Sequence, residues 1–522
     1  MKARHLLSLA TLGLAAWAFR AEATAPAGHP LLLIGFDGGE WSVIEDLWTR
    51  GELPNLQRLA NEGVRAPLET EYGWSPVIWT TVATGHVPDV HGITGFVVAT
   101  DDGDVPVSSE MRKVPAIWNI TSAADMRTNL VGWWGSWPPE SVNGVNISER
   151  CQSDVPDCAT PLDWNASVEG SIGALNTAHM QLWPGKANFA PEDRVTTEWA
   201  PRLAKDFDFM AMYVHGTDPN SHKYWQYFRP GDFDSEPDPE RLAKHQDKIP
   251  RAYRSFDTVV GRVLESAGDD VNVIIVSDHG FHALDDVTVK VTFDLDKLLV
   301  HLGYATYTDG TIDVGQSQMW TYGSALNEAR KRVRISMEGR DPGGTHTDET
   351  AAALRAELEA RLATITYTGG EPAFTIEDAS PRDQQRGGDF VISTNEVGVS
   401  KALLIDGEKT KGIIAGWVEN SGGHSGDPAG VFIAHGPDID PAADMSGIRI
   451  HDVTPTLLYG LGLPVGEDME GEPFTKLFSA KFQADNPLQT VNTYGERTSS
   501  TATSTAEDAA MIRQLRQLGY ME

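Results

Sequence analysis

The chain has 522 residues, of which 40% are apolar and 22% are charged, as in an ordinary folded protein rather than a disordered one. This length is enough for one large α/β domain or two smaller ones. The net charge of −32, from 74 acidic and 42 basic residues, argues against binding nucleic-acid polymers or anionic membranes through a general positive field. An anionic substrate would instead need a locally positive binding site, such as one formed by bound metal ions.

The first 23 residues are typical of a signal peptide. Lys2 and Arg4 precede an apolar run over residues 6–19, and the AEA stretch that ends at Ala23 fits a cleavage site. The run is short for a membrane span, and an uncleaved anchor is the alternative. No later run is long enough to span a membrane either. We therefore expect a periplasmic or secreted mature chain with no transmembrane span.

Four apolar runs of strand length recur along the chain. They cover residues 31–36 (LLLIGF), 209–214 (FMAMYV), 271–276 (VNVIIV) and 430–434 (GVFIA). Continuous rather than alternating apolar runs are typical of strands buried on both faces, as in parallel sheets covered by helices. Helical patterns lie between them, at residues 53–62, 116–124 and 249–267. This alternation predicts an α/β fold with a largely parallel central sheet.

Three of these runs lead into an aspartate. Asp37 follows the first run directly, Asp218 follows the second after three residues, and Asp278 follows the third after one. Each of them taken alone is explained as a turn former. Ligands of open α/β sheets bind beyond the carboxyl ends of the strands, so three carboxylates there predict a shared binding site.

Histidines accompany these aspartates. His222 lies four residues after Asp218, where a helix that starts at Pro219 with Asp218 as its cap would let both side chains reach one ion. His279 follows the third aspartate directly. His424 lies in a Gly-rich loop (SGGHSGD) that either approaches an ion closely or is a mobile surface segment. Carboxylates with neutral imidazoles suit zinc or manganese better than calcium or magnesium.

The stretch SPVIWTT places Ser75 directly before Pro76. Serine suits a helix cap and proline suits the first helical position, so a capped helix start explains both residues. The same position would present a serine nucleophile at the positive end of a helix, where a phosphoryl group binds well. The local residues leave both interpretations open.

The ordered motifs resemble the alkaline phosphatase superfamily, in its type I phosphodiesterase/nucleotide pyrophosphatase branch. The resemblance runs from about Leu31 to about Phe474 and rests on FDG, SPxxWTTxxTGxxPxxHGI, DxxxH, SDHGF, GGHS and DVTPTLLYGLGLP. It implies an alkaline-phosphatase-like three-layer sandwich with inserted cap regions. It also implies a hydrolase of small phosphate esters that uses two divalent metal ions, with zinc preferred and manganese as the alternative.

The resemblance also implies a role for each candidate residue. Three side chains would hold one ion: Asp218, His222 and His424. Three more would hold the other, with the Ser75 oxygen beside it: Asp37, Asp278 and His279. The family's nucleophile lies ten residues before the Gly of the TG pair, and that position here is Ser75. Catalysis would then pass through a phosphoseryl intermediate.

The surroundings of Ser75 bear on the substrate class. Monoesterases of this superfamily add an Arg beside the nucleophile, but no Arg lies between Arg65 and Arg112. We therefore expect phosphodiesters or nucleotide pyrophosphates, with phosphomonoesters and other phosphate or phosphonate esters as the alternative. Nucleotide pyrophosphatases carry an Asn three residues after the Ile of the HGI motif, and this chain departs from them there with Phe96.

Two other functions fit parts of the pattern. A sulfatase shares the fold, but its nucleophile lies in a C/S-x-P-x-R context that Ser75 lacks. A non-catalytic metal-binding surface protein would keep the fold and the ions for binding or stability, and the complete ligand set argues against it. The sequence carries no signal for the oligomeric state.

A cysteine pair and two insertions complete the organisation. Cys151 and Cys158 are separated by six residues, and export to an oxidising compartment predicts a disulfide between them, with free thiols as the alternative. We expect a catalytic domain over residues 24–480, with insertions at about 141–201 and 285–420. The second insertion is interpreted as a cap over the metal site, or as a crossover with extra surface strands. A polar linker and a C-terminal helix are expected over residues 481–522.

Overall fold

The computed structural model describes residues 28–100, 103–153, 155, 157–171, 193–308, 311–322, 329–385, 387–426, 428–499 and 508. The predicted signal peptide lies outside these residues, as does the predicted C-terminal helix apart from Asp508. Within the described ranges, each helix is too short or too polar to cross a membrane.

The central sheet of the described chain has eight strands in the order β2-β21-β9-β1-β8-β5-β6-β7. In chain order they are β1 (Leu31–Phe36), β2 (Val64–Leu68), β5 (Thr128–Val131), β6 (Gly144–Ile147), β7 (Ala159–Thr160), β8 (Phe209–Val214), β9 (Asn272–Val276) and β21 (Gly430–His435). The inner strands from β9 to β6 are parallel, so the predicted α/β fold with a largely parallel sheet is confirmed. The fourth apolar run forms β21, but β21 runs antiparallel to β9 and β2 and does not continue the parallel set.

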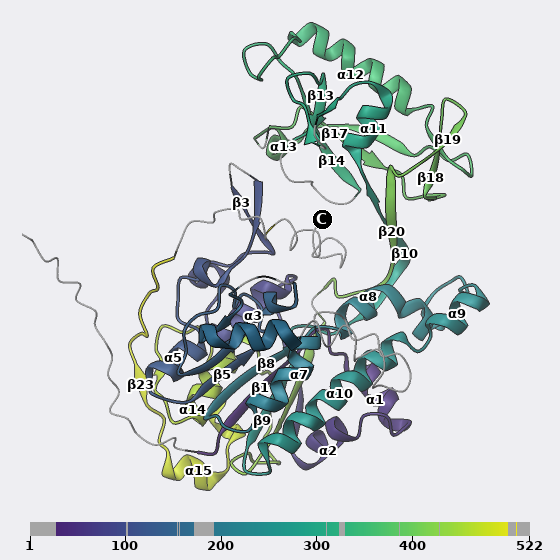
Figure 1. The fold of residues 1–522 in the computed structure, drawn as a ribbon. Coiled ribbons are helices and arrows are strands. Elements are labelled where there is room, and N and C mark those ends of the chain that lie inside the picture. Colours follow the sequence, from purple (N-terminus) through teal and green to yellow (C-terminus); the bar gives the residue numbers. More distant parts are fainter. Residues whose placement is uncertain are drawn as a thin grey trace, which may run out of the picture.

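Helices cover both faces of this sheet because its strands are apolar on both sides. In β1, Leu31 and Leu33 pack into one core, whereas Leu32, Ile34 and Phe36 pack into the other. The helices of the first core include α3 (Ser75–Thr84), α5 (Ile117–Ala123) and α14 (Val453–Gly460). Those of the second core are α1 (Trp41–Thr49), α2 (Pro54–Glu62), α7 (Asp193–Leu203), α8 (Thr217–Phe228) and α10 (Lys248–Ala267). The result is a three-layer sandwich (Figure 1).

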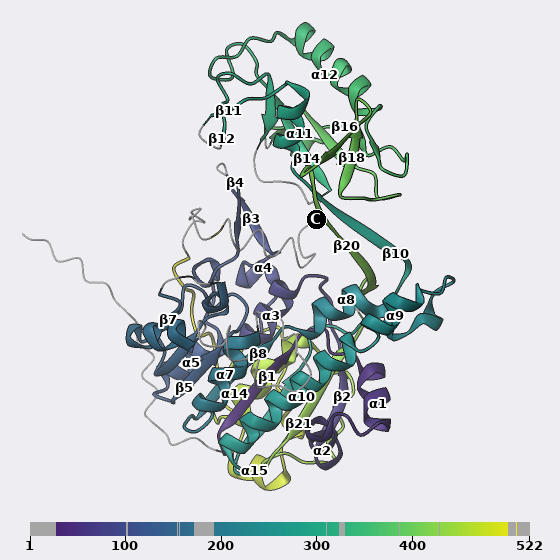
Figure 2. The same cartoon turned by 45° about the vertical axis from the view of Figure 1, so that its right-hand side comes forward.

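Smaller elements surround the sandwich. They include α4 (Pro88–His91), the hairpin of β3 (Val97–Thr100) and β4 (Gly103–Pro106), α9 (Pro239–His245) and α15 (Ala480–Asp485). In Figures 1 and 2, α9 extends beyond α8 at one side, and α15 lies at the opposite end of the sandwich from the β3–β4 hairpin.

A two-stranded antiparallel ribbon leaves the sandwich beside α8 and carries a second group of elements (Figure 2). The ribbon consists of β10 (His282–Phe293) and β20 (Ile414–Gly423). We call the segment between its strands, residues 294–413, the outer module. Its elements include α11 (Leu295–Leu302), β13 (Met319–Thr321), β14 (Arg330–Ile335), α12 (Asp348–Leu362), β15 (Thr366–Tyr367), β16 (Phe374–Asp378), β17 (Phe390–Thr394), β18 (Ala402–Ile405) and β19 (Glu408–Lys411). They enclose a core of their own, in which Leu298, Leu358 and Phe390 are fully buried.

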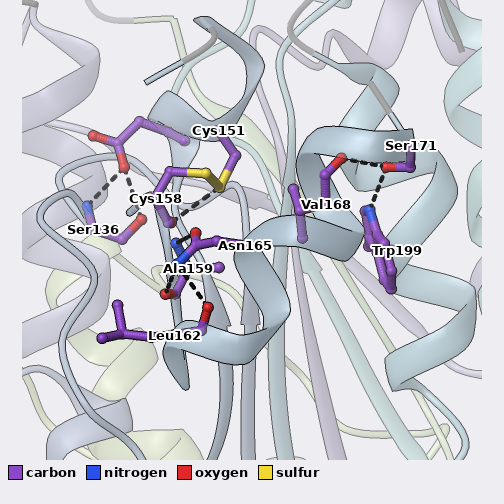
Figure 3. The surroundings of a disulfide bond; sticks show 10 residues. Ser136, Cys151, Cys158, Ala159, Leu162, Asn165, Val168, Ser171 and Trp199 are labelled. Carbon is purple, nitrogen blue, oxygen red and sulfur yellow. Dashed lines mark hydrogen bonds between the residues drawn. A yellow bond between two sulfur atoms is a disulfide. The ribbon is translucent and has the colours of Figure 1, made fainter. Parts of the chain in front are cut away.

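The segment over residues 141–201 extends the central sheet through β6 and β7 and contains the cysteine pair. Cys151 and Cys158 form a disulfide whose two residues are fully buried. Beside it, the Asn165 side chain accepts from the Ala159 amide (2.8 Å) and donates to Ala159 O (3.1 Å), as Figure 3 shows. The disulfide therefore closes a short loop against β7.

Replacing both cysteines by alanine should lower the free energy of unfolding by about 2.5 kcal/mol, because a crosslink restricts the unfolded chain. Urea unfolding of the oxidised protein and of the Cys151→Ala/Cys158→Ala variant measures the difference. The wild type under reducing conditions is the control and should match the variant. Equal stability of the oxidised wild type and the variant would contradict a structural disulfide.

Candidate active site

Three buried carboxylates meet at the carboxyl ends of β1, β8 and β9. Asp37, Asp218 and Asp278 each have 0% exposed surface. β1 lies between β8 and β9 in parallel register, so the strand ends fall side by side. The Asp37 amide donates to Val214 O (3.1 Å), and the Gly38 amide donates to Asp278 Oδ1 (3.1 Å). These hydrogen bonds tie the turns that carry the carboxylates to one another.

Asp218 lies inside the first turn of α8 rather than capping it. The helix begins at Thr217 with Gly216 as its N-cap residue, so the predicted cap role of Asp218 is wrong. The physical reason is a tertiary contact, because the Thr217 hydroxyl donates to Asp37 O. His222 still lies on the same helix face, with Nε2 3.5 Å from Asp218 Oδ1.

Two histidines present their Nε2 atoms to these carboxylates. His279 Nδ1 donates to Gly280 O (2.9 Å), so the other ring nitrogen faces the cluster, 3.3 Å from Asp278 Oδ2. His222 Nδ1 donates to Gly422 O (2.9 Å) in the same way. A backbone carbonyl that accepts from one ring nitrogen is a common means of orienting histidine metal ligands.

His424 closes the cluster from the end of β20. It directly follows this strand, and its ring stacks on His279 with the centroids 3.7 Å apart. Burial, with repulsion from His279 and His222, lowers the pKa of His424 to about 2, so the ring stays neutral. Phe281 packs against all three imidazoles at centroid distances of 4.8, 5.5 and 5.7 Å and shields them from solvent.

The possible ligand atoms form two overlapping groups, each with its atoms within 4.8 Å of one another. One group consists of Asp218, His222 and His424. The other consists of Asp37, Asp218 and His279. The first group is the set that the resemblance implies for one ion. The second contains two of the three residues implied for the other ion, and the third of them, Asp278, contacts His279.

Among the residues that the structure describes, several buried polar atoms of the cluster have no hydrogen-bond partner, namely Asp37 Oδ1, Asp278 Oδ2 and His279 Nε2. Burial, followed by repulsion from Asp278 and Asp218, raises the pKa of Asp37 well above its ordinary value. Burial alone would lower the pKa of His279, but attraction to the three carboxylates raises it overall. Buried, mutually repelling carboxylates beside imidazoles fit divalent cations, which would satisfy these atoms.

Two side chains on and after β8 hold Asp37 in place. Tyr213 donates to Asp37 Oδ2, and His215 Nδ1 lies 3.0 Å from the same oxygen. Trp134 Nε1 in turn donates to the Tyr213 hydroxyl (2.8 Å). Burial raises the pKa of Tyr213 and keeps the hydroxyl protonated. Sequence reasoning missed the role of Tyr213, and the only signal for it was a single polar aromatic in an otherwise apolar run.

Ser75 begins α3 and faces a pocket that it shares with metal-ligand candidates. The N-cap residue is Trp74, so the predicted cap role of Ser75 is wrong. Ser75 is 3% exposed and lines a pocket of about 440 Å³ together with His222 and His424. The positive end of α3 favours a phosphoryl group in this pocket. All seven predicted site residues therefore line this pocket or belong to the adjoining cluster.

Replacing Tyr213 by phenylalanine should weaken zinc binding by about 10- to 100-fold, because the variant loses the hydroxyl that orients Asp37. Competition with a chelator measures the dissociation constant. Tyr304→Phe is the matched control, since the Tyr304 hydroxyl donates to Glu357 (2.9 Å) in the outer module. An unchanged zinc affinity in Tyr213→Phe would show that this contact does not position a ligand.

The comparison with curated proteins found no match. Among solved structures, phosphonoacetate hydrolase from Sinorhizobium meliloti 1021 in complex with phosphonoformate has 16% identity and a TM-score of 0.42, covering 84% of this chain and 95% of that chain. An inactive variant of murine ectonucleotide pyrophosphatase/phosphodiesterase 5 in complex with AMP has 16% identity and a TM-score of 0.40. The match covers 86% of this chain and 100% of that chain. The human protein of that name has 14% identity and a TM-score of 0.39, with the same coverage.

A family model gives the assignment. The model for type I phosphodiesterase / nucleotide pyrophosphatase matches residues 31–400, which is more than half of the chain. The matched span contains every predicted site residue except His424. The chain therefore belongs to the type I phosphodiesterase / nucleotide pyrophosphatase family and is a phosphoric ester hydrolase.

Proposed function

We propose that this chain is an exported two-metal hydrolase that cleaves phosphodiesters or nucleotide pyrophosphates, with Ser75 as its nucleophile. The observation that carries the proposal is the buried Asp and His cluster, which shares His222 and His424 with the pocket that Ser75 lines. Family membership supplies the reaction class. The cluster and the serine supply the chemical groups that such a reaction needs.

The cluster would hold two divalent ions, zinc in preference and manganese as the alternative. Asp218, His222 and His424 would hold one of them. Asp37, Asp278 and His279 would hold the other, beside Ser75. Neutral imidazoles with carboxylates favour zinc over calcium or magnesium. Bound there, the two ions would supply the positive charge that lowers the pKa of the serine hydroxyl and stabilises the phosphoryl group.

Ser75 would attack the phosphorus atom in line with the leaving oxygen. A phosphoseryl bond forms as the ester P–O bond breaks, and water then hydrolyses that bond and regenerates the serine. The N-terminus of α3 stabilises negative charge at this position. Burial of Ser75 to 3% exposure limits the access of bulk water to the nucleophile before the substrate binds.

The pocket favours diesters over monoesters. A monoester leaves more charged oxygens to neutralise, and the described residues that line the pocket include no arginine to meet them; the one lysine among them, Lys290, belongs to the ribbon. A diester carries less charge on its phosphoryl oxygens. It also has a second substituent, which other parts of the pocket lining can bind. Phosphomonoesters and other phosphate or phosphonate esters are the alternative substrates of the same site.

Export is supported by the Cys151–Cys158 disulfide, since disulfides persist in oxidising compartments. The N-terminal segment with the composition of a signal peptide points the same way. We therefore place the enzyme in the periplasm or outside the cell.

The Ser75→Ala variant should lower kcat/KM for nitrophenyl propyl phosphate by about a thousandfold or more, because the nucleophile is lost. Zinc content is measured for each preparation. Ser221→Ala is the matched control and should retain activity. Ser221 is a buried serine next to His222, and its hydroxyl has no hydrogen-bond partner within the described ranges. Undiminished turnover by Ser75→Ala with its metal intact would overturn the nucleophile assignment.

The same assay with nitrophenyl phosphate compares a monoester that has the same leaving group. We expect the diester to be cleaved with the higher kcat/KM. A monoester preference of about tenfold or more, a difference of about 1.4 kcal/mol in transition-state binding, would contradict the diester class. If neither ester is cleaved by zinc-loaded protein, the alternative of a non-catalytic metal-binding protein gains support.

A further inference from the structure

The pocket in front of Ser75 has a second polar wall that the reaction described above does not use. One wall carries Ser75, His222 and His424. The other is the ribbon, from which Thr288, Lys290 and Asn420 line the same 440 Å³ space. We call these three residues the ribbon triad.

The register of the ribbon places the triad on one face. Asn420 of β20 pairs directly with Thr288 of β10, and the Thr288 hydroxyl donates to Asn420 O (3.5 Å). Directly opposed residues of antiparallel strands point to the same side, and so do residues two apart along one strand. Lys290 therefore shares this face with the other two residues.

The opposite face of the ribbon is braced against the sandwich. Glu419, the neighbour of Asn420, forms an ion pair with Arg241 of α9 and accepts from the Tyr227 hydroxyl of α8 (3.4 Å). Closer to the cluster, the backbone N–H of Gln226 donates to Ser421 Oγ (3.1 Å). These contacts fix the rotation of β20 about its own axis, so the triad stays turned toward the pocket.

The triad also differs chemically from the rest of the lining. Among the described residues that line the pocket, Lys290 carries a full positive charge and none is acidic. The Lys290 charge also acts on Glu396 of the outer module, where it opposes the rise in the pKa of Glu396 that burial causes. Asn420 is 6% exposed, and its buried Oδ1 finds no hydrogen-bond partner in the described part of the chain. The NH2 group of the same amide is the donor that Asn420 can offer to an anionic ligand.

The remaining wall is apolar. Trp74 is 43% exposed beside Ser75, and its ring meets Phe96 edge to face with centroids 5.9 Å apart. Phe96 occupies the position where nucleotide pyrophosphatases carry an amide donor, and it cannot donate a hydrogen bond. Apart from Ser425, the polar side chains of the described lining that lie away from Ser75 and the histidines are those of the ribbon.

We propose that the ribbon triad is a subsite for a second anionic group of the substrate, borne by the ester substituent that does not leave. This inference rests on the proposed function and narrows its substrate class to diesters or phosphonates that carry a carboxylate or a further phosphoryl group. Lys290 pairs with the second charge, and the side-chain NH2 group of Asn420 donates a hydrogen bond to its oxygens. The Thr288 hydroxyl donates to Asn420 O and lines the wall beside them.

Three substrates with one leaving group test the subsite. Nitrophenyl propyl phosphate has an uncharged arm, nitrophenyl carboxyethyl phosphate carries a carboxylate, and nitrophenyl phosphonoethyl phosphate carries a phosphonate. At least one charged arm should raise kcat/KM by about tenfold or more over the propyl arm, the scale of one charge-assisted hydrogen bond. The charged arm that gives the higher kcat/KM shows whether the subsite prefers a carboxylate or a phosphonate group.

Lys290→Met should abolish this preference, and Asn420→Asp should turn it into discrimination against the charged arms, since a carboxylate there repels them. Lys401→Met is the matched control and should keep the wild-type ratio, because the Lys401 ammonium packs over the Trp417 ring (5.3 Å) and does not line the pocket. A ratio of two substrates on one preparation does not depend on the folded fraction, so partial misfolding of a variant does not affect the result.

Two outcomes separate this inference from the proposed function. If the wild type cleaves the three diesters equally, or if Lys290→Met keeps the preference for a charged arm, the subsite is wrong while the hydrolase assignment stands. If Ser75→Ala and the wild type act alike on the propyl ester, the proposed function itself fails.

Discussion

The burial of three carboxylates side by side is the constraint on which the rest of the site depends. Asp37, Asp218 and Asp278 are fully buried, and charges of one sign in the protein interior are costly unless opposite charge compensates them. The surrounding contacts orient the ligands rather than neutralise them. Tyr213 and His215 hold Asp37 from behind, and backbone carbonyls direct the ring nitrogens of the histidines. Such an arrangement is stable with cations in place, which links the fold of the sandwich to its chemistry.

The ribbon links the same cluster to the substrate. The carbonyl of Gly422 in β20 accepts a hydrogen bond from His222. His424 directly follows the end of β20, and Asn420 lies four residues before it. This close approach requires glycine, since a Cβ on Gly422 would lie 2.3 Å from Ser221 O. One strand therefore positions two metal-ligand candidates and part of the far wall of the pocket.

Local patterns predicted much of this arrangement. β1 and β8 match the predicted apolar runs residue for residue, and their ends carry the predicted carboxylates. The starts of α3 and α8 lie earlier than cap preferences indicate. At α8 the tertiary hydrogen bond of Thr217 to Asp37 O overrides the local preference. The direction of β21, the contact between Tyr213 and Asp37, and the ribbon triad depend on which distant segments become neighbours. A single sequence does not state those neighbours, and so they could not be predicted.

Metal stoichiometry tests the central claim most directly. The purified chain is loaded with zinc, freed of excess ion and analysed by elemental mass spectrometry, beside an Asp37→Asn variant. The account predicts two zinc ions per wild-type chain, and one in the variant, because Asp218, His222 and His424 still form a complete group without Asp37. Fewer than two ions per wild-type chain after loading would contradict the two-metal site.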